Sequence, residues 1–125
     1  MTKIRTFKTG ATRDTDENKH EYIGYISPLT LKRFAEYMTK HRKQADGNLR
    51  SSSNWKKGIP KEAYMQSLMR HIIDLWLHWD GFPEEAREDI EEALCGIIFN
   101  SSGFMHEHMK DKLYNKTKNI KTSKE

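Results

Sequence analysis

The sequence predicts an all-α fold of three or four packed helices, preceded by an extended, loop-rich N-terminal arm. Three observations support this prediction. Apolar residues recur at helical spacing in three separate stretches, and a proline stands near the start of each of them. Residues 1–21 are polar and show no helical period. At 125 residues the chain is long enough for one domain, which we divide into an arm (1–26), a helical domain (27–114) and a disordered, Lys-rich tail (115–125).

The first predicted helix begins at Ser27-Pro28, because serine is a favourable N-cap and proline suits the first helical position. Its expected buried stripe consists of Leu31, Phe34, Ala35 and Met38. Before it, residues 22–26 are predicted to be a short extended piece.

The second predicted helix runs from Pro60 to about Trp79, and the third begins at Pro83 with a possible bend at residues 101–103. The apolar faces of both helices are broad, which indicates contact on more than one side. We therefore expect a homo-oligomer, since a single small chain is not expected to cover faces of this breadth.

The composition excludes several classes of protein. No apolar run approaches the roughly 20 residues of a transmembrane helix, and residues 1–14 lack the apolar stretch of a signal peptide. The single Cys95 excludes a disulfide framework and a multi-cysteine zinc site within one chain. We expect a cytoplasmic protein with no membrane partner.

Charge is segregated along the chain. Residues 1–59 carry 13 Lys or Arg against 6 Asp or Glu, residues 60–109 carry 3 against 10, and residues 110–125 carry 6 against 2. A nucleic-acid-binding protein usually presents one continuous basic face, so nucleic acid is not the expected partner. Either the basic and acidic parts attract one another, or the basic part receives a phosphorylated small molecule.

Six carboxylates lie within residues 84–92. Glu88 and Glu91 are three positions apart, so a helix would turn them to one side, where they can share a hard cation such as Mg²⁺. Glu92 borders the apolar residues that are expected to face inward. The candidate metal ligands are therefore Glu88, Glu91 and Glu92. In the alternative interpretation these acids are solvated and complement the helix dipole.

His71 and Asp74 share one face of the second helix. A histidine and a carboxylate at this spacing can hold a metal or orient a water, which makes them the candidate catalytic residues if the protein is an enzyme. Otherwise they form a hydrogen-bonded seam between helices. Arg70 interrupts an apolar stretch, and it either pairs with the acidic helix or binds a phosphate.

Trp55 stands beside an asparagine and two lysines. A tryptophan ring can stack on a base while lysines neutralise phosphates; alternatively, Trp55 anchors its loop and the lysines are solvated. Asn100 interrupts an apolar run, so it needs a ligand or a neighbouring helix as hydrogen-bond partner. The candidate ligand-binding residues are Arg13, Asn54, Trp55, Lys56, Lys57, Arg70, His71 and Asn100.

Five segments, in chain order, resemble a known phage family: TGATRD, SPLTLKRFAEYM, NWKKGIP, RHIID and EEALCGIIFN. Its members are described as dATP/dGTP diphosphohydrolase N-terminal-like domains, and they are linked to MazG-like all-α nucleoside triphosphate pyrophosphohydrolases. The resemblance covers most of residues 8–109. It implies Mg²⁺ held against a triphosphate by a Glu-x-x-Glu pair, which Glu88 and Glu91 match, and by a Glu-x-x-Asp pair. That second pair is missing, because Lys110 follows Glu107 at the required spacing. His71 and Asp74 would have to replace it.

This departure favours binding over hydrolysis. The first hypothesis is a phage-type protein that holds a phosphorylated purine nucleotide without turnover, for example a sponge that sequesters a cyclic-nucleotide immune signal in the host cytoplasm. Residues 27–114 would then be a nucleotide-binding domain that needs no cofactor. The alternatives are a Mg²⁺-dependent (d)NTP pyrophosphohydrolase and a helical protein-interaction module. Four converging carboxylates would favour the enzyme, whereas a pocket of Arg, Lys, Trp and Asn would favour the binding protein.

Overall fold

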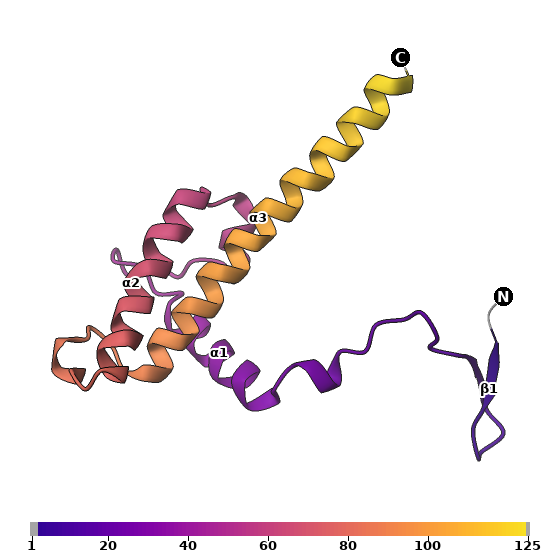
Figure 1. Cartoon of the computed structure of the whole chain (residues 1–125), viewed down its shortest axis with the longest axis horizontal. Coiled ribbons are helices and arrows are strands. Elements are labelled where there is room, and N and C mark those ends of the chain that lie inside the picture. Colours follow the sequence, from indigo (N-terminus) through magenta and orange to yellow (C-terminus); the bar gives the residue numbers. More distant parts are fainter. Residues whose placement is uncertain (1–2, 125) are drawn as a thin grey trace. The chain divides into compact units, whose positions relative to one another are not determined.

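The structure, a computed structural model, describes the backbone of residues 3–124 and the side chains of residues 3–119. Two compact units, residues 1–31 and 32–125, are described separately. The helical fold is confirmed, since three α-helices account for most of the described chain (Figure 1). Within residues 3–124 the strands form one small two-stranded sheet. The domain boundaries at residues 26 and 114 stay predictions.

The first unit contains an antiparallel hairpin of β1 (Ile4–Thr6) and β2 (Thr12–Asp14). Gly10 makes the turn with a φ of +90°, a conformation that glycine adopts without strain, and its amide donates to the carbonyl of Phe7 at 2.9 Å. The sequence analysis expected an extended, loop-rich arm here. The hairpin forms because β-branched residues flank a turn-forming Thr-Gly step.

The expectation of an extended piece at residues 22–26 is wrong. Residues Ile23–Tyr25 form a 3₁₀ helix, η1. The carboxylate of Glu21 accepts a hydrogen bond from the amide of Gly24 at 3.0 Å, which stabilises this turn locally.

Helix α1 (Pro28–Lys40) begins where the sequence predicts. Its N-cap is confirmed, since the amide of Thr30 donates to Ser27 Oγ at 3.3 Å. The buried stripe differs from the prediction: Leu31 is exposed, and Tyr37 is the buried residue of this helix. Arg33 and Lys40 of this helix pair with acids at the start of α3, as described below.

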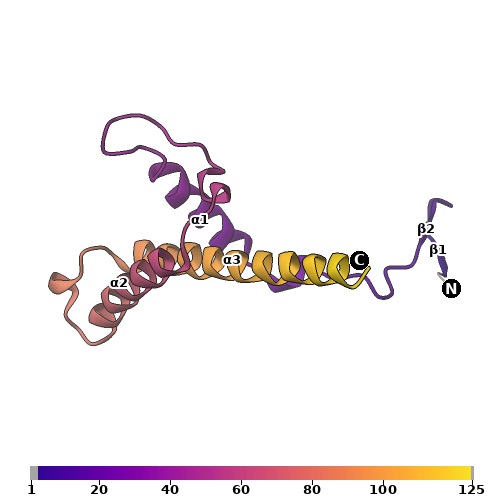
Figure 2. The ribbon, with the colours of Figure 1, turned by 90° about the horizontal axis from the view of Figure 1, so that it is seen from above.

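Helices α2 (Lys61–Trp79) and α3 (Ile90–Lys124) run antiparallel and form the centre of the second unit (Figures 1 and 2). They approach closely at two glycines of α3. A Cβ added at Gly96 would lie 2.5 Å from the ring of His71, and one added at Gly103 would lie 2.3 Å from the ring of Tyr64. The predicted bend at residues 101–103 is absent, because α3 is continuous there.

The third helix begins later than predicted. Residues Pro83–Glu85 form a separate 3₁₀ helix, η3, and Ala86 is extended. Helix α3 starts at Ile90, where the side chain of Asp89 accepts the amide of Glu92 at 2.8 Å. An aspartate cap is favourable at this position, and the backbone before it is held instead by a contact with Asp74, described below.

Helix α3 continues to Lys124, whereas the sequence analysis predicts a disordered tail from residue 115. The side chains of residues 115–119 are exposed. The helix extends past its packed part because elongation adds one hydrogen bond per residue to an existing helix. Residue 125 and the side chains from residue 120 onward lie outside the described part. No helix among the described residues is both long enough and apolar enough to cross a membrane.

Candidate ligand site

A cavity of about 420 Å³ lies within the second unit, between the end of α1, the loop that follows it, α2 and α3. This volume lies within the usual range of small-molecule sites. The loop contains a short 3₁₀ helix, η2 (Asn54–Lys57), and an isolated bridge between Lys43 and Leu49. Its length, more than the helix packing, creates the cavity.

One wall of the cavity is basic: it carries His41, Arg42, Lys43 and Arg50. The two arginines are held together by the backbone, since the amide of Arg50 donates to the carbonyl of Arg42 at 2.8 Å. The guanidinium Nε of Arg42 donates back to the carbonyl of Arg50 at 3.0 Å. Among the described residues that line the cavity there is no aspartate or glutamate, so the wall favours an anionic ligand.

Trp55 lines the cavity and is half-buried. Its ring meets the ring of His106 on α3 edge to face, with the centroids 4.8 Å apart, and Lys56 Nζ lies 5.6 Å from its centroid. Trp55 therefore anchors its loop to α3 and also presents ring surface to the cavity. The contact with His106 agrees with the anchoring interpretation, while stacking on a base stays a prediction.

Tyr37 also lines the cavity. Burial, together with the nearby carboxylates of Glu88 and Glu92, raises the pKa of Tyr37 to about 12. Its hydroxyl therefore stays protonated at neutral pH and can donate a hydrogen bond. The ring packs on His41 with 4.3 Å between the centroids.

His71 of α2 and Asn100 of α3 line the cavity where the two helices meet. Asn100 is buried, and its Nδ2 donates to the carbonyl of Gly96 at 2.7 Å. The neighbouring turn of its own helix thus provides one of the partners that a buried asparagine requires.

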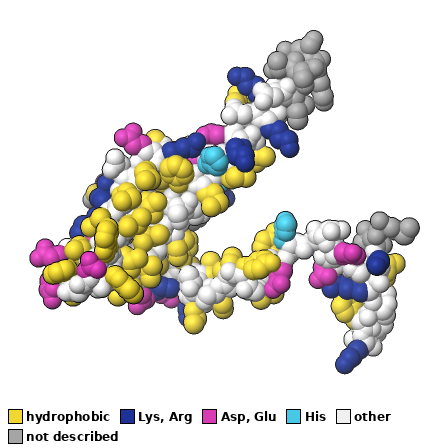
Figure 3. Space-filling view, in the orientation of Figure 1, with side chains coloured by type: hydrophobic (Ala, Val, Ile, Leu, Met, Phe, Trp, Pro, Cys, Tyr) yellow, Lys and Arg dark blue, Asp and Glu magenta, His cyan; other side chains and the backbone are white. Residues whose placement is uncertain are grey.

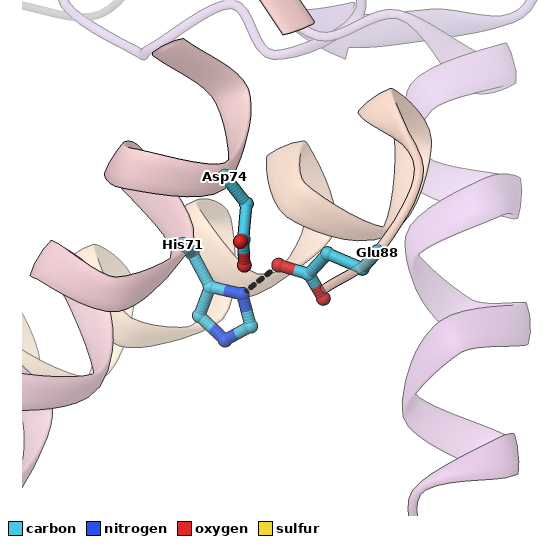
Figure 4. Close-up of side chains that lie close together, drawn as sticks. All are labelled: His71, Asp74 and Glu88. Carbon is cyan, nitrogen blue, oxygen red and sulfur yellow. Dashed lines mark hydrogen bonds and ion pairs between the residues drawn. The ribbon is translucent and has the colours of Figure 1, made fainter. Parts of the chain in front are cut away.

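On α2 and the connection that leads to α3, His71 belongs to a second group of polar side chains, with Asp74 and Glu88 (Figure 4). One ligand-type atom from each of these three residues lies within 4.8 Å of the others. The Nδ1 of His71 hydrogen-bonds the carboxylate of Glu88. His78 lies one turn beyond Asp74 on α2, and its Nε2 donates to the carbonyl of Glu88 at 2.6 Å. These contacts hold the α2–α3 connection against α2.

Arg87 holds Asp74 from the same connection. Its backbone amide donates to Asp74 Oδ1 at 3.0 Å, and its guanidinium donates to Oδ2 at 3.0 and 2.6 Å. Burial opposes the ionisation of Asp74, but these hydrogen bonds outweigh it and hold the pKa of its carboxyl group below the ordinary value. Asp74 is therefore a charged, buried and fully engaged residue.

The donor set of the cluster fits Mg²⁺ poorly. This ion prefers six oxygens in octahedral geometry, whereas the cluster offers one imidazole and two carboxylates, a set better suited to a transition metal. Arg87 already occupies the carboxylate of Asp74. The arrangement can act without any metal as a polar seam between helices, which is the alternative that the sequence analysis left open.

Glu91 and Glu92 do not join this cluster. Arg33 of α1 donates to Glu91 Oε1 at 2.8 Å and to Glu92 Oε1 at 3.3 Å, and Lys40 also pairs with Glu92. The structure thus places basic side chains of α1 where the sequence analysis placed a cation. It brings Glu88 to His71 and Asp74 instead.

Of the predicted ligand-binding residues, the cavity brings together Asn54, Trp55, His71 and Asn100. Lys56 and Lys57 are exposed on η2, beside the lining residues. Arg70 is exposed on α2 and does not line the cavity. Arg13 belongs to β2 of the first unit.

Sequence reasoning missed Tyr37, Arg42 and Arg50 as lining residues, and Arg87 as the partner of Asp74. The two lining arginines stand in a turn-rich segment with no motif that distinguishes them from solvated residues. For Arg87 the only signal was a lone basic residue within an acidic run.

Comparison with known proteins identifies no relative: no family model, no curated protein and no solved structure matches the chain.

Proposed function

We propose that the chain binds a phosphorylated purine nucleotide in the cavity of the second unit and releases it unchanged. The observation that carries this proposal is the lining: three cationic side chains, two histidines, a tryptophan and two asparagines, without a carboxylate among the described lining residues. Phosphates pair with cations, and a base can stack on the indole of Trp55. Purine as the base rests on the resemblance to the dATP/dGTP diphosphohydrolase N-terminal-like family.

Binding without turnover is supported by the carboxylates outside the cavity. A triphosphate-bound Mg²⁺ requires oxygen ligands in nearly fixed geometry. Here Glu91 and Glu92 pair with α1, and Asp74 pairs with Arg87. A phage protein that sequesters a cyclic nucleotide of its host is one form that such a binding protein would take.

The proposal is tested by incubating the protein with a panel of purine and pyrimidine nucleotides, linear and cyclic, with and without Mg²⁺. The bound fraction and the released compounds are separated by chromatography after denaturation. We expect an intact purine nucleotide to be recovered in both conditions. Release of pyrophosphate would contradict binding without turnover, and absence of binding across the panel would contradict the proposed ligand class.

A second candidate function is a metal-dependent nucleoside triphosphate pyrophosphohydrolase. One observation favours it: His71 both lines the cavity and belongs to the cluster with Asp74 and Glu88. A metal held there would lie beside a phosphate in the cavity and would supply Lewis-acid activation.

Arg87→Ala separates the two candidates, because it removes the guanidinium that engages Asp74. If the cluster binds a metal, this variant should bind Mn²⁺ more tightly than the wild-type protein in a calorimetric titration. If the cluster is a polar seam, neither protein should bind Mn²⁺, and the variant should lose about 3–5 kcal/mol of stability because Asp74 is left buried without its partner.

A further inference from the structure

One face of the α2–α3 pair is apolar and bare. Along α2, four large side chains recur every three or four residues and are 42–59% exposed: Met65, Met69, Ile73 and Trp76. On α3, three more are 42–63% exposed: Ile90, Leu94 and Met105. Figure 3 shows apolar side chains gathered over α2 and α3 on the side turned to the viewer. At 100° per residue, the three residues on α3 lie roughly 120–180° around that helix from Gly96 and Gly103, which contact α2. We therefore call only the four residues of α2 the apolar face.

The apolar face is not the side that carries the cavity. At 100° per residue, its four members on α2 lie roughly 100–180° around the helix from Tyr64 and His71, whose rings pack on the glycines of α3. In Figure 2, α1 and the loop that follows it lie to one side of the α2–α3 pair. Helix α2 is therefore apolar on two sides: one packs against α3, and the other is exposed.

We propose that the apolar face binds the same face of a second copy of this chain, in antiparallel orientation, to form a four-helix bundle. Exposed apolar side chains that gather on one face mark a surface that binds a partner. A face that pairs with itself about a two-fold axis needs no other partner. This proposal goes beyond the proposed function and does not depend on the ligand.

The charges at the two ends of the α2–α3 pair support a second copy as the partner, and they also indicate its orientation. The turn end, residues 80–91, carries six acidic side chains against one basic. The open end, residues 56–62 and 107–119, carries seven lysines against three acidic side chains. A two-fold axis perpendicular to the helices places each acidic end over the partner's basic end, which is favourable. An axis parallel to the helices would place acid over acid.

The same symmetry determines which helices meet. When two layers stack about an axis that is perpendicular to their helices, α2 lies over the partner's α2 and runs antiparallel to it. Met65 then approaches the partner's Trp76, near one end of the apolar face. Two copies of Met65 stay about 16 Å apart, since 11 residues separate positions 65 and 76 along the helix.

The first test is the mass of the full chain in solution, measured by light scattering during size-exclusion chromatography at tens of micromolar. We expect twice the chain mass of 14.8 kDa. Met69→Lys combined with Ile73→Lys should give the monomer mass with an unchanged helical circular-dichroism spectrum, because both positions are already partly exposed in one copy. Ala63→Lys is the matched control: it adds a charge to an exposed position on another side of α2, and it should stay dimeric.

The second test is the orientation. Met65→Cys and Trp76→Cys variants are mixed and oxidised. Wild-type protein treated in the same way gives the background level of crosslinking through Cys95, which is buried. We expect crosslinks chiefly between the two different variants. Crosslinks within each variant alone would indicate parallel helices and overturn the proposed orientation.

A wild-type chain of monomer mass would overturn the second copy as occupant. A double-lysine variant that stays dimeric would also overturn the proposal, because the dimer would then use another surface. Higher salt should weaken the dimer, since the charges at its ends are screened.

Discussion

Trp55 has two roles that one substitution does not separate. It lines the cavity, and its ring packs against His106 of α3. An aromatic–base stack is worth roughly 1–3 kcal/mol by alanine substitution. Trp55→Ala should therefore weaken binding of the tightest nucleotide in the panel by about ten- to a hundred-fold, measured by isothermal titration calorimetry.

His106→Ala is the control for this prediction. It removes the ring partner of Trp55 but leaves the residues that line the cavity unchanged. We expect a small loss of affinity for His106→Ala. An equal loss in the two variants would mean that Trp55 acts by anchoring its loop and not by stacking on the ligand.

Glu92 connects α1 to the start of α3. The hydrogen bond from Lys40 holds the pKa of Glu92 below its ordinary value; burial opposes this, and Arg33 adds to the lowering. The unfolded chain then binds more protons than the folded one, so Glu92 stabilises the fold above its unfolded pKa, and this stabilisation is lost as the pH falls through the folded value.

Glu92→Gln should therefore lower the free energy of unfolding at pH 7 by about 1–3 kcal/mol, the range for hydrogen bonds to charged groups. The difference from wild type should shrink as the pH falls below about 4. Urea unfolding across a pH series measures both effects. Glu84→Gln changes an exposed carboxylate on η3 and should be nearly neutral; a constant difference at every pH would contradict the ion-pair explanation.

At the scale of the elements, α2 and α3 pack at short distance because α3 has glycine at two contact points. Alanine normally stabilises a helix by about 1 kcal/mol relative to glycine. At Gly103, however, the new Cβ would lie 2.3 Å from the buried ring of Tyr64, and overpacking typically costs about 1–3 kcal/mol.

Gly103→Ala is therefore expected to lower the melting temperature, against the helix propensity of alanine. Ser102→Ala, at an exposed position next to it, should leave the melting temperature unchanged or slightly raised. If Gly103→Ala proved as stable as wild type, the two helices would not be in such close contact at this point.

At the scale of the whole chain, the basic part of the sequence is divided between two places in the second unit. Arg33 and Lys40 of the basic part pair with acids of α3, while Arg42 and Arg50 face the cavity. The described side chains of the basic C-terminal extension, residues 115–119, are exposed.

Deletion of residues 115–125 should accordingly leave the melting temperature nearly unchanged, since the side chains of residues 115–119 are exposed. Affinity for a phosphorylated ligand should fall only slightly, through lost long-range attraction. Thermal melts and titrations of the shortened chain measure these effects. A loss of several degrees would show that the extension packs against the rest of the protein.

The sequence by itself determined the features that depend on neighbouring residues. The helical class, the Ser27 cap of α1 and the start of α2 after Pro60 were predicted correctly, because caps and helical periodicity act within a few positions. Asn54 and Trp55 could be selected as cavity residues for a similar reason, since they form one short segment of suitable chemistry.

Only the tertiary structure decided which charged residues meet. Arg33 and Glu91 are 58 positions apart, and Arg87 reaches Asp74 across the turn between two helices. Arg87 holds the backbone before α3 against Asp74, and Glu91 and Glu92 pair with α1 and not with the predicted metal site. A sequence does not distinguish a solvated acidic or basic residue from one that is paired. Their partners depend on the packing of whole helices, which local spacing does not encode.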